Sequence, residues 1–306
     1  MLTQIPLAAS RSETVPTPAV GGIETLVGNT PLLPLRRVAR HCAEGVSVWV
    51  KAEWFNASGS VKARPAWAIL RRVLAQGDLK GRRLLDATSG NMGIAYATFA
   101  AALGVPLTLA MPANASPERI AILQGLGAEL VLTDPEEGVD GAMAWVKGQA
   151  ERHPERYLWI NQYDNPANWQ AHYETTGPEI VRQTQGQITH FVAGTGTGGT
   201  LMGAGRYLRE VLPDVQLIGV QPAGSDEPID GLKHMASARW QPGIYDPSFP
   251  DAVRYVRVSQ AQTMALRLVR EEGLFVGFSA AAAVWAACEI AADLREGMVV
   301  AILPDA

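Results

Sequence analysis

Cysteine is almost absent from this sequence. Its 306 residues include only Cys42 and Cys288, and these two do not form a CxxC pair. This argues against a disulfide framework and against a zinc site built from thiolates. The five histidines never fall at HxxxH or HExxH spacing, so the pattern gives no support for a metal site. Such cysteine usage is typical of the reducing cytoplasm, where we expect the protein to act.

A block of basic residues is also lacking. The net charge is -4 and the lysines and arginines are not clustered, which argues against nucleic acid as a partner. Residues 1–20 contain no apolar run of the length found in signal peptides. The most membrane-like segment, 277–294, is rich in alanine and includes Glu289. We therefore expect a buried core helix there, and no membrane partner.

What the sequence does contain is a regular alternation of strand-like and helix-like segments. A hydrophobic content of 47% is ordinary for a globular enzyme and excludes global disorder. The length suits one large domain or two modest ones. Alternation of this kind implies parallel sheets with helices on both faces, in which ligands bind beyond the carboxyl ends of the strands.

The expected elements follow one another along the chain. Strands are expected at 46–53, 83–86, 106–111, 129–132, 157–160, 189–192, 216–220, 255–258 and 298–303. Helices are expected from about 66, at 91–103, 116–126 and 139–152, after 166, from a glycine-rich loop to about 210, at 259–272 and from 279. Residues 221–252 are rich in Pro, Gly and Asp and are expected to be irregular.

A lysine stands where the first of these helices begins. Residues 56–60 form a loop of small residues after the strand at 46–53, and Lys62 lies between this loop and a helical pattern. A helix N-terminus is electropositive and favours anions, so a charged lysine is unfavourable there. A neutral lysine, or one bound as an imine, suits the position better. The alternative is a surface lysine that extends from the helix end into solvent.

A second signal is a cluster of glycines in the segment 191–200. Within six residues it contains Gly194, Gly196, Gly198 and Gly199. Glycines let backbone N–H groups approach an anion, and the helix that follows adds its dipole, so the segment suits a phosphate group. A tight turn alone would need one or two glycines. The dinucleotide motif G-x-G-x-x-G is also satisfied, but the next strand ends in Gln221 with no acidic residue for a ribose, which disfavours that alternative.

Polar residues precede several other expected helices. Thr88, Ser89 and Asn91 either cap a helix or use its free N–H groups, with their own, to bind a substrate carboxylate. By itself, Gln162 belongs to an ordinary polar loop before a helix that starts with proline. Ser279 is an N-cap serine on an alanine-rich helix.

Together these stretches resemble the fold-type II pyridoxal-phosphate (PLP) enzymes, in the cysteine synthase and cystathionine β-synthase family. Residues 56–64 resemble its Asn-Pro-x-Gly-Ser-Val-Lys-Asp-Arg segment, with Ala57 in place of the proline and Ala63 in place of the aspartate. The resemblance covers residues 23–304 with the motifs in family order. It is closest to the cysteine synthase B branch, for example at 172–179.

The resemblance implies an α/β fold like that of the tryptophan synthase β chain. It has two domains, each with a mostly parallel sheet flanked by helices, and the cofactor lies in the cleft between them. The smaller, mobile domain is expected at 55–160. The larger, PLP-binding domain is expected at 23–54 plus 161–306, after an N-terminal arm at 1–22.

The resemblance also implies roles for individual residues. Lys62 would be the Schiff-base lysine, and Ser279 would hydrogen-bond the pyridine nitrogen of PLP. Asn91 would contact the 3′-hydroxyl of the cofactor, and Gln162 would reach the substrate carboxylate. The rest of that carboxylate site would be the Asn loop, made of Thr88, Ser89, Asn91 and Met92, where methionine replaces a family threonine. The 5′-phosphate would be held by Gly196, Thr197, Gly198, Gly199 and Thr200.

The implied activity is a PLP-dependent β-replacement in a homodimer. It would make L-cysteine from an activated serine, O-acetylserine, and sulfide through an α-aminoacrylate intermediate, with Lys62 as the general base. Three alternatives stay open. The substrate would be O-phosphoserine if Lys233 meets its phosphate. The enzyme would be another β-replacing or β-eliminating lyase of the same fold, which makes cystathionine or dehydrates serine, or the protein would be a non-catalytic relative.

Overall fold

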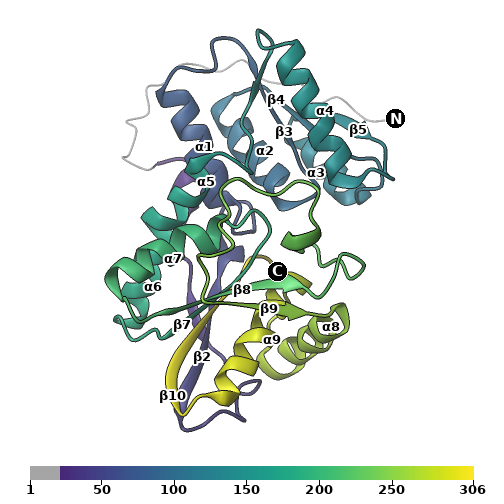
Figure 1. The fold of residues 1–306 in the computed structure, drawn as a ribbon. Coiled ribbons are helices and arrows are strands. Elements are labelled where there is room, and N and C mark those ends of the chain that lie inside the picture. Colours follow the sequence, from purple (N-terminus) through teal and green to yellow (C-terminus); the bar gives the residue numbers. More distant parts are fainter. Residues whose placement is uncertain (1–20) are drawn as a thin grey trace, which may run out of the picture.

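Two β-sheets form the framework of the protein. The computed structural model describes residues 21–306, so the expected arm at 1–22 lies almost wholly outside the described residues. The larger sheet has the strand order β1-β2-β10-β7-β8-β9 and the smaller sheet the order β5-β4-β3-β6. In Figure 1 the smaller sheet lies above the larger one. The larger sheet consists of β1 (Leu32–Pro34), β2 (Gly45–Ala52), β7 (His190–Gly194), β8 (Gln216–Pro222), β9 (Ala252–Val256) and β10 (Glu296–Leu303). The smaller consists of β3 (Arg83–Ala87), β4 (Leu107–Pro112), β5 (Glu129–Thr133) and β6 (Tyr157–Trp159).

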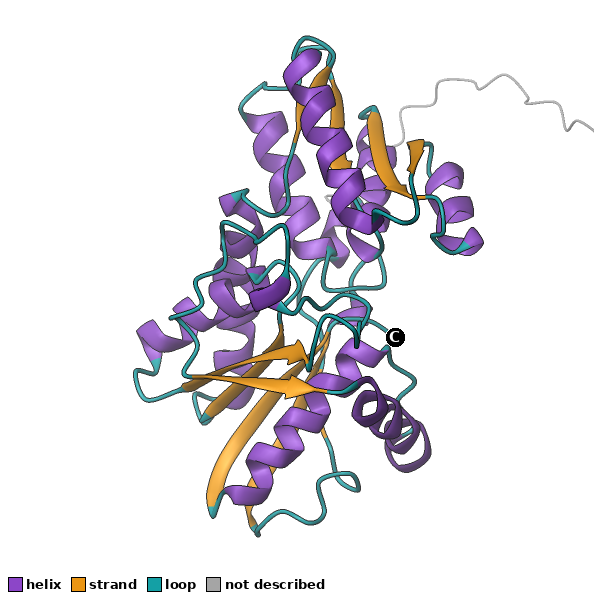
Figure 2. Ribbon diagram, turned by 45° about the vertical axis from the view of Figure 1, so that its right-hand side comes forward, coloured by secondary structure: helices purple, strands orange, loops and turns teal. Residues whose placement is uncertain are grey.

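Helices lie on both sides of these sheets (Figure 2). The α-helices are α1 (Ala63–Ala75), α2 (Asn91–Leu103), α3 (Pro117–Gly125), α4 (Gly138–Arg152), α5 (Pro166–Ala171), α6 (Gly177–Thr184), α7 (Gly199–Val211), α8 (Val258–Arg267) and α9 (Phe278–Asp293). Single 3₁₀ turns occur at η1 (Ile23–Leu26), η2 (Glu53–Phe55) and η4 (Met235–Ser237), and π-helical turns at η3 (His172–Thr176) and η5 (Leu268–Glu272).

The strand β10 shows how the larger sheet is buried on both faces. Its side chains point alternately to opposite faces, as the pleat of a strand requires. Val299 and Ala301 belong to the apolar cluster that includes α8 and α9, whereas Val300 and Ile302 belong to the cluster that includes α7. A central strand covered in this way must be apolar throughout, which is why its sequence signal is strong.

The direction of the strands brings distant segments together. All described strand pairs are parallel except β1 with β2. In the larger sheet β10 lies between β2 and β7, with Val300 opposite both Trp49 and Phe191. The carboxyl ends of these three strands therefore meet at one edge, and the segments that follow them lie side by side there. Those segments lead to Lys62, to the glycine-rich loop and to Asp305.

The expected buried helix at 277–294 is confirmed as α9. Its alanines from Ala280 to Ala287 are buried against the larger sheet, because a helix with small side chains can approach a sheet closely. No helix among residues 21–306 combines the length and the apolar character needed to span a membrane.

Some expected boundaries are wrong. The strand expected at 255–258 is β9 at 252–256, and Val258 already begins α8. The helix starts early because it is capped at Arg257. The backbone N–H of Arg257 donates to the side chain of Gln260 at 2.8 Å, which ends the strand and begins α8. The helix expected at 259–272 changes from α to π form at Leu268, which a pattern of 3.6 residues per turn does not reveal.

The expected division into domains agrees with the sheets. Every strand of the smaller sheet lies within 55–160, and every strand of the larger sheet lies outside it. The bounds themselves stay a prediction, and we propose them on this basis.

A buried cluster of four charged side chains fixes the start of α1; we call it the ion cluster. Arg64 contacts Glu53 at 2.7 and 2.8 Å and Glu179 at 2.8 Å through two nitrogens, and Lys51 contacts Glu179 at 2.7 Å. These side chains are at most 6% exposed. Burial would raise the pKa of Glu179, but the hydrogen bonds and charge of Arg64, with Lys51, outweigh it and lower the pKa to about 2.

The ion cluster leads to a prediction about stability. The substitution Arg64→Met should lower the free energy of unfolding by about 3–5 kcal/mol, because it leaves buried Glu53 without its ion-pair partner and Glu179 with Lys51 as its remaining one. Arg71→Met on the same helix is the control, since Arg71 is 61% exposed and its contact with Glu174 is 3.6 Å long. Urea unfolding of both variants measures the difference. Equal midpoints for the two variants would show that the ion cluster does not stabilise the fold.

Candidate active site

One cavity collects most of the residues singled out in the sequence. It has a volume of about 250 Å³ and is lined by loops at the carboxyl ends of strands from both sheets. Of the thirteen predicted site residues, those that line it are Lys62, Thr88, Ser89, Asn91, Met92, Gln162, Gly196, Thr197, Lys233 and Ser279. The other three, Gly198, Gly199 and Thr200, follow directly after Thr197 at the start of α7 and do not line it.

Lys62 lies immediately before α1, as the sequence predicts. Its side chain is half-buried, and burial lowers the pKa of its amine, although the negative charge of Asp305 opposes the shift. A lowered pKa increases the fraction of neutral amine, which is the form that attacks a carbonyl group or accepts a proton.

The glycine-rich loop leaves its backbone close to the cavity. Gly198 has a φ of +85° and stands before α7, a helix of 13 residues. A Cβ atom on Gly196 would lie 2.4 Å from the carbonyl oxygen of Gly231, and one on Gly199 would lie 2.0 Å from Oδ1 of Asn168. These close approaches explain why glycine is needed. The start of a helix of this length, with free N–H groups, suits a phosphate dianion.

Two hydroxyls of this loop are held by buried polar side chains. Nδ2 of Asn168 donates to the Thr197 hydroxyl at 3.1 Å, and Nε2 of His172 lies 3.3 Å from the Thr200 hydroxyl. Burial lowers the pKa of His172 to about 3, so the ring is neutral at neutral pH. If Nε2 carries the ring proton, the Thr200 hydroxyl accepts it and keeps its own hydrogen for a phosphate oxygen.

The Asn loop is shaped by Thr88. The Thr88 hydroxyl accepts hydrogen bonds from the N–H groups of Gly90 and Gly93 at 3.2 and 3.0 Å. It thereby folds the loop over the start of α2. Met92 is 4% exposed and packs in the apolar cluster around α2 while it also borders the cavity. Where the resembling family has a threonine hydroxyl, this chain therefore presents the apolar surface of Met92 to the cavity.

Gln162 is tied to the Asn loop through a buried carboxylate. Asp86 at the end of β3 accepts hydrogen bonds from the N–H groups of Ala87 and Gln162 at 2.9 and 3.1 Å. Nε2 of Gln162 also donates to the Ala87 carbonyl at 3.1 Å. Burial raises the pKa of Asp86 to about 6, although these hydrogen bonds oppose the shift. The contacts place the Gln162 side chain next to the Asn loop.

Lys233 and Ser279 border the cavity on the side of the larger sheet. The Lys233 amine lies 4.9 Å from the centre of the Tyr163 ring and 3.9 Å from Oδ1 of Asp140. Burial lowers the pKa of Lys233, against the charge of Asp140. The N-cap of α9 is Gly277, so the expected capping role of Ser279 is wrong. Ser279 is buried in the first turn of α9, where its hydroxyl is a neutral polar group.

Three charged residues that line the cavity are not among the predicted site residues, namely Arg119, Asp230 and Asp305. Arg119 donates to the Ser89 carbonyl at 3.0 Å and contacts Asp230 at 3.2 Å, so it bridges the Asn loop and the segment before Lys233. Asp305 accepts a hydrogen bond from Nδ2 of Asn91 at 2.6 Å. The available signal for Asp305 was its place two residues after the buried strand β10.

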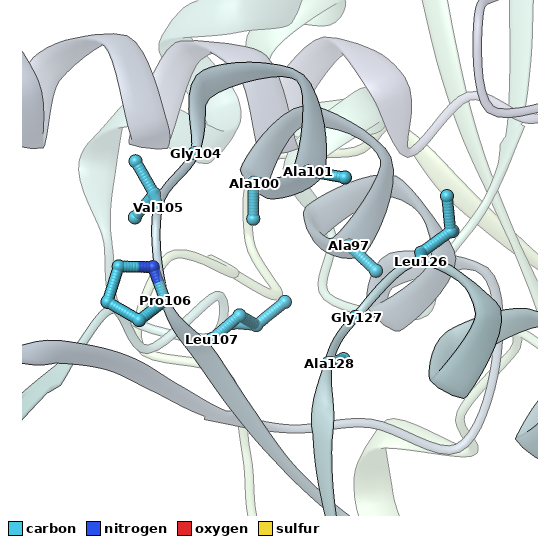
Figure 3. A pocket seen from close by; sticks show the side chains of 10 residues that line it. All are labelled: Ala97, Ala100, Ala101, Gly104, Val105, Pro106, Leu107, Leu126, Gly127 and Ala128. Carbon is cyan, nitrogen blue, oxygen red and sulfur yellow. The ribbon is translucent and has the colours of Figure 1, made fainter. Parts of the chain in front are cut away.

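A second hollow lies away from these groups, at the C-terminal end of α2 (Figure 3). It has a volume of about 220 Å³ and is lined by small or apolar residues from 97–107 and 126–128. None of its lining residues titrates or bears a nucleophile, so the chemistry belongs to the first cavity.

The arrangement fits PLP. The start of α7 offers N–H groups and hydroxyls for a phosphate, Lys62 offers an amine for an aldehyde, and Ser279 offers a hydroxyl for a ring nitrogen. A family model described as "Pyridoxal-phosphate dependent enzyme" matches residues 23–305. The chain belongs to this family. It is therefore a PLP-dependent enzyme with the fold-type II architecture that the sequence predicted.

Named relatives of the chain are cysteine synthases. Cysteine synthase from Aquifex aeolicus is 48% identical over 286 residues, which make up 92% of this chain and 87% of that protein. Cysteine synthase B from Salmonella typhimurium is 41% identical, and the match covers 92% of both chains.

Solved structures of the family resemble the fold closely. The crystal structure of cysteine synthase from Entamoeba histolytica has a TM-score of 0.88 and 31% identity, and covers 99% of this chain and 91% of that one. The O-acetylserine dependent cystathionine beta-synthase from Helicobacter pylori has a TM-score of 0.86 and 30% identity, and covers 94% of this chain and 96% of that one.

The close packing of Gly196 leads to a prediction about cofactor binding. Gly196→Ala should weaken the binding of PLP roughly ten-fold or more, because the added methyl group must push the loop away from the Gly231 carbonyl. Gly125→Ala is the control, since a Cβ atom there meets nothing within 4 Å. Absorbance titration of both apoenzymes with PLP measures the affinities. Unchanged affinity for Gly196→Ala would show that the loop does not hold the cofactor.

Proposed function

We propose that this enzyme makes L-cysteine from O-acetylserine and sulfide by a PLP-dependent β-replacement. The observation that carries the proposal is the convergence of Lys62, the Asn loop, Gly196 and Thr197 of the glycine-rich loop, and Ser279 on one cavity. The names of the relatives, cysteine synthase and cysteine synthase B, support the same activity.

Each part of the cavity has a distinct task in this proposal. When bound, PLP withdraws electrons from Cα of the amino acid. The Asn loop and Gln162 bind the substrate carboxylate and orient the Cα–H bond toward Lys62. The neutral Lys62 amine takes the proton from Cα, acetate leaves from Cβ, sulfide adds at Cβ, and Lys62 returns the proton to Cα. Burial of Lys62 supports this role because it disfavours the charged amine.

Ser279 favours elimination over other chemistry. A hydroxyl beside the pyridine nitrogen does not supply the charge that would keep this nitrogen protonated, whereas a carboxylate would. The electron demand of the cofactor is then modest. A cofactor that withdraws electrons only modestly is best suited to eliminating a good leaving group from Cβ.

A second candidate substrate is O-phosphoserine. The specific observation in its favour is Lys233, a half-buried cation at the cavity whose nearest acidic contact, Asp140, is 3.9 Å away. The amine also donates to the Trp240 carbonyl at 3.5 Å, and because both contacts are long it can exchange them for a phosphate leaving group. Another nucleophile in place of sulfide, such as the thiol that forms cystathionine, is a further variant of the reaction, supported by the name of the Helicobacter pylori neighbour.

We also propose that the protein is a homodimer in the cytoplasm. Large apolar side chains are exposed along residues 255–278, where Phe275 is 79% and Leu266 is 55% exposed. Such side chains are typical of a surface that a second subunit covers. Unpaired Cys42 and Cys288 support a reducing compartment.

Removal of Lys62 tests the proposed function. Lys62→Ala should abolish cysteine formation, because the variant has no amine to bind the cofactor covalently or to take the Cα proton. Lys80→Ala, at an exposed lysine away from the cavity, should keep the activity of the wild type. Cysteine produced from O-acetylserine and sulfide is measured for both. Substantial cysteine formation by Lys62→Ala would refute the assignment.

Removal of Lys233 tests the second candidate. Lys233→Ala should lower turnover of O-phosphoserine roughly ten-fold or more and leave turnover of O-acetylserine nearly unchanged, because only the phosphate needs the cation. Lys147→Ala removes the same charge from the exposed face of α4 and serves as the control. Steady-state rates with both substrates decide the question. Equal changes for the two substrates would exclude a phosphate contact.

A further inference from the structure

A carboxylate that none of these roles uses lies beside Lys62. Asp305 follows β10, whose carboxyl end lies between those of β2 and β7. The Pro304 carbonyl accepts a hydrogen bond from the N–H of Val61 at 2.8 Å, and Asp305 pairs with Ser60 in an antiparallel bridge. In Figures 1 and 2 the C-terminal end of the chain accordingly lies between the two sheets. Asp305 is therefore held in place by the residues directly before Lys62.

One oxygen of this carboxylate orients Asn91. Oδ2 of Asp305 accepts a hydrogen bond from Nδ2 of Asn91 at 2.6 Å. Asn91 is the first residue of α2, which follows β3 of the smaller sheet, so this bond connects segments that follow strands of different sheets. An ionised carboxylate only accepts hydrogen bonds, so it selects the NH₂ end of the amide. The second N–H of Asn91 then stays available to the cavity.

The other oxygen has no hydrogen-bond partner. Oδ1 of Asp305 is buried and unpaired among the described residues. It lies so close to Gly277 that a Cβ atom on that glycine would be 2.4 Å away. A buried, unpaired oxygen of this kind is costly, which suggests that it is retained for a purpose other than stability.

The charge of Asp305 acts on Lys62 through space. Asp305 raises the pKa of the Lys62 amine and so opposes the effect of burial, but the two side chains form no direct ion pair. Burial raises the pKa of Asp305 itself, whereas the hydrogen bond from Asn91 and the positive charges of Lys62 and Arg119 oppose the shift and the charge of Asp230 adds to it. The charge of Lys62 also acts on His172, but burial lowers the pKa of that ring to about 3, so it carries no charge at neutral pH.

We propose that Asp305 is a positioning residue of this active site, which orients the Asn91 amide and provides the counter-charge for Lys62 when its amine becomes an ammonium group. The inference rests on the proposed roles of Lys62 and Asn91. In the proposed reaction the Cα–H bond breaks, its electron pair stays with the substrate, and the proton forms an N–H bond at Nζ. A nearby carboxylate lowers the cost of that buried positive charge. Because it makes no direct contact, it does not lock Lys62 in the charged form.

The isosteric variant Asp305→Asn tests the proposal, with Asp293→Asn as the control. Asp293 is exposed at the far end of α9, so its substitution removes the same charge away from the cavity. The apoenzymes are mixed with PLP over about pH 6–10, and the rate of covalent capture is followed by visible absorbance. Only the neutral amine reacts, so the pH profile reports the titration of Lys62.

We expect the profile of Asp305→Asn to move to lower pH. Without the carboxylate the ammonium form is less favoured, so on the rising part of the profile the rate relative to its plateau should increase about three-fold or more. PLP should also dissociate several-fold faster, because the amide introduced by this substitution can present either its oxygen or its NH₂ group to Asn91. Asp293→Asn should match the wild type in both measurements.

A profile for Asp305→Asn that coincides with the wild type would overturn the proposal, even if PLP bound less tightly. Loss of structure alone weakens binding but does not shift a titration. Unfolding in urea checks that the variant folds. Lys62→Ala apoenzyme is included because covalent capture by that variant would overturn the proposed role of Lys62 itself, which separates failure of the function from failure of this inference.

Discussion

The buried ion cluster is the constraint on which the active site depends. Each buried ion costs several kcal/mol of desolvation, so four of them are tolerated only when the geometry is close to ideal. Arg64 meets this demand because its planar guanidinium forms paired hydrogen bonds with both Glu53 and Glu179. The cluster joins β2, η2, α1 and α6. Lys62 is two residues from Arg64. The ion pairs of Arg64 therefore also fix the position of Lys62 at the cavity.

The second constraint is the order of the strands. Neighbouring strands lie about 4.8 Å apart, and β10 has β2 on one side and β7 on the other. A residue that follows each strand therefore falls within one small region. In this way the sheet delivers Lys62, the glycine-rich loop and Asp305 to the same cavity, although they are far apart in the sequence. The smaller sheet contributes the Asn loop and Gln162 by the same rule, after β3 and β6.

The sequence predicted what local patterns encode. Helix α2 at 91–103 was expected with its observed bounds, since an apolar pattern and a polar start precede Gly104, which adopts the left-handed conformation that ends a helix. The glycine-rich loop and Lys62 were also visible, because special backbone positions and helix ends leave a residue signature. The π-helical turns were not, since their sequences still follow a helical pattern.

Features that depend on tertiary contacts were not predictable in this way. Lys51 and Glu179 are 128 residues apart, and neither looks unusual in its own segment. In the sequence, Asp305 is likewise only a polar residue after a strand. Its contact with Asn91 is formed by the fold and has no local signal. Met92 was noticed only because the resembling family has threonine there. Its burial in the apolar cluster around α2 is a result of packing, which one sequence does not disclose.

The groups proposed to bind the cofactor have in common that they are uncharged. In the proposed site, a phosphate meets N–H groups and threonine hydroxyls at the start of α7, and the ring nitrogen meets the neutral hydroxyl of Ser279. Neither device places a full positive charge near Lys62. A cationic phosphate site would add repulsion to the burial that already lowers the pKa of this amine, and would make it too weak a base for the Cα proton. In the proposed reaction, burial favours the neutral amine of Lys62, and the charge of Asp305 opposes this effect when the same amine accepts a proton.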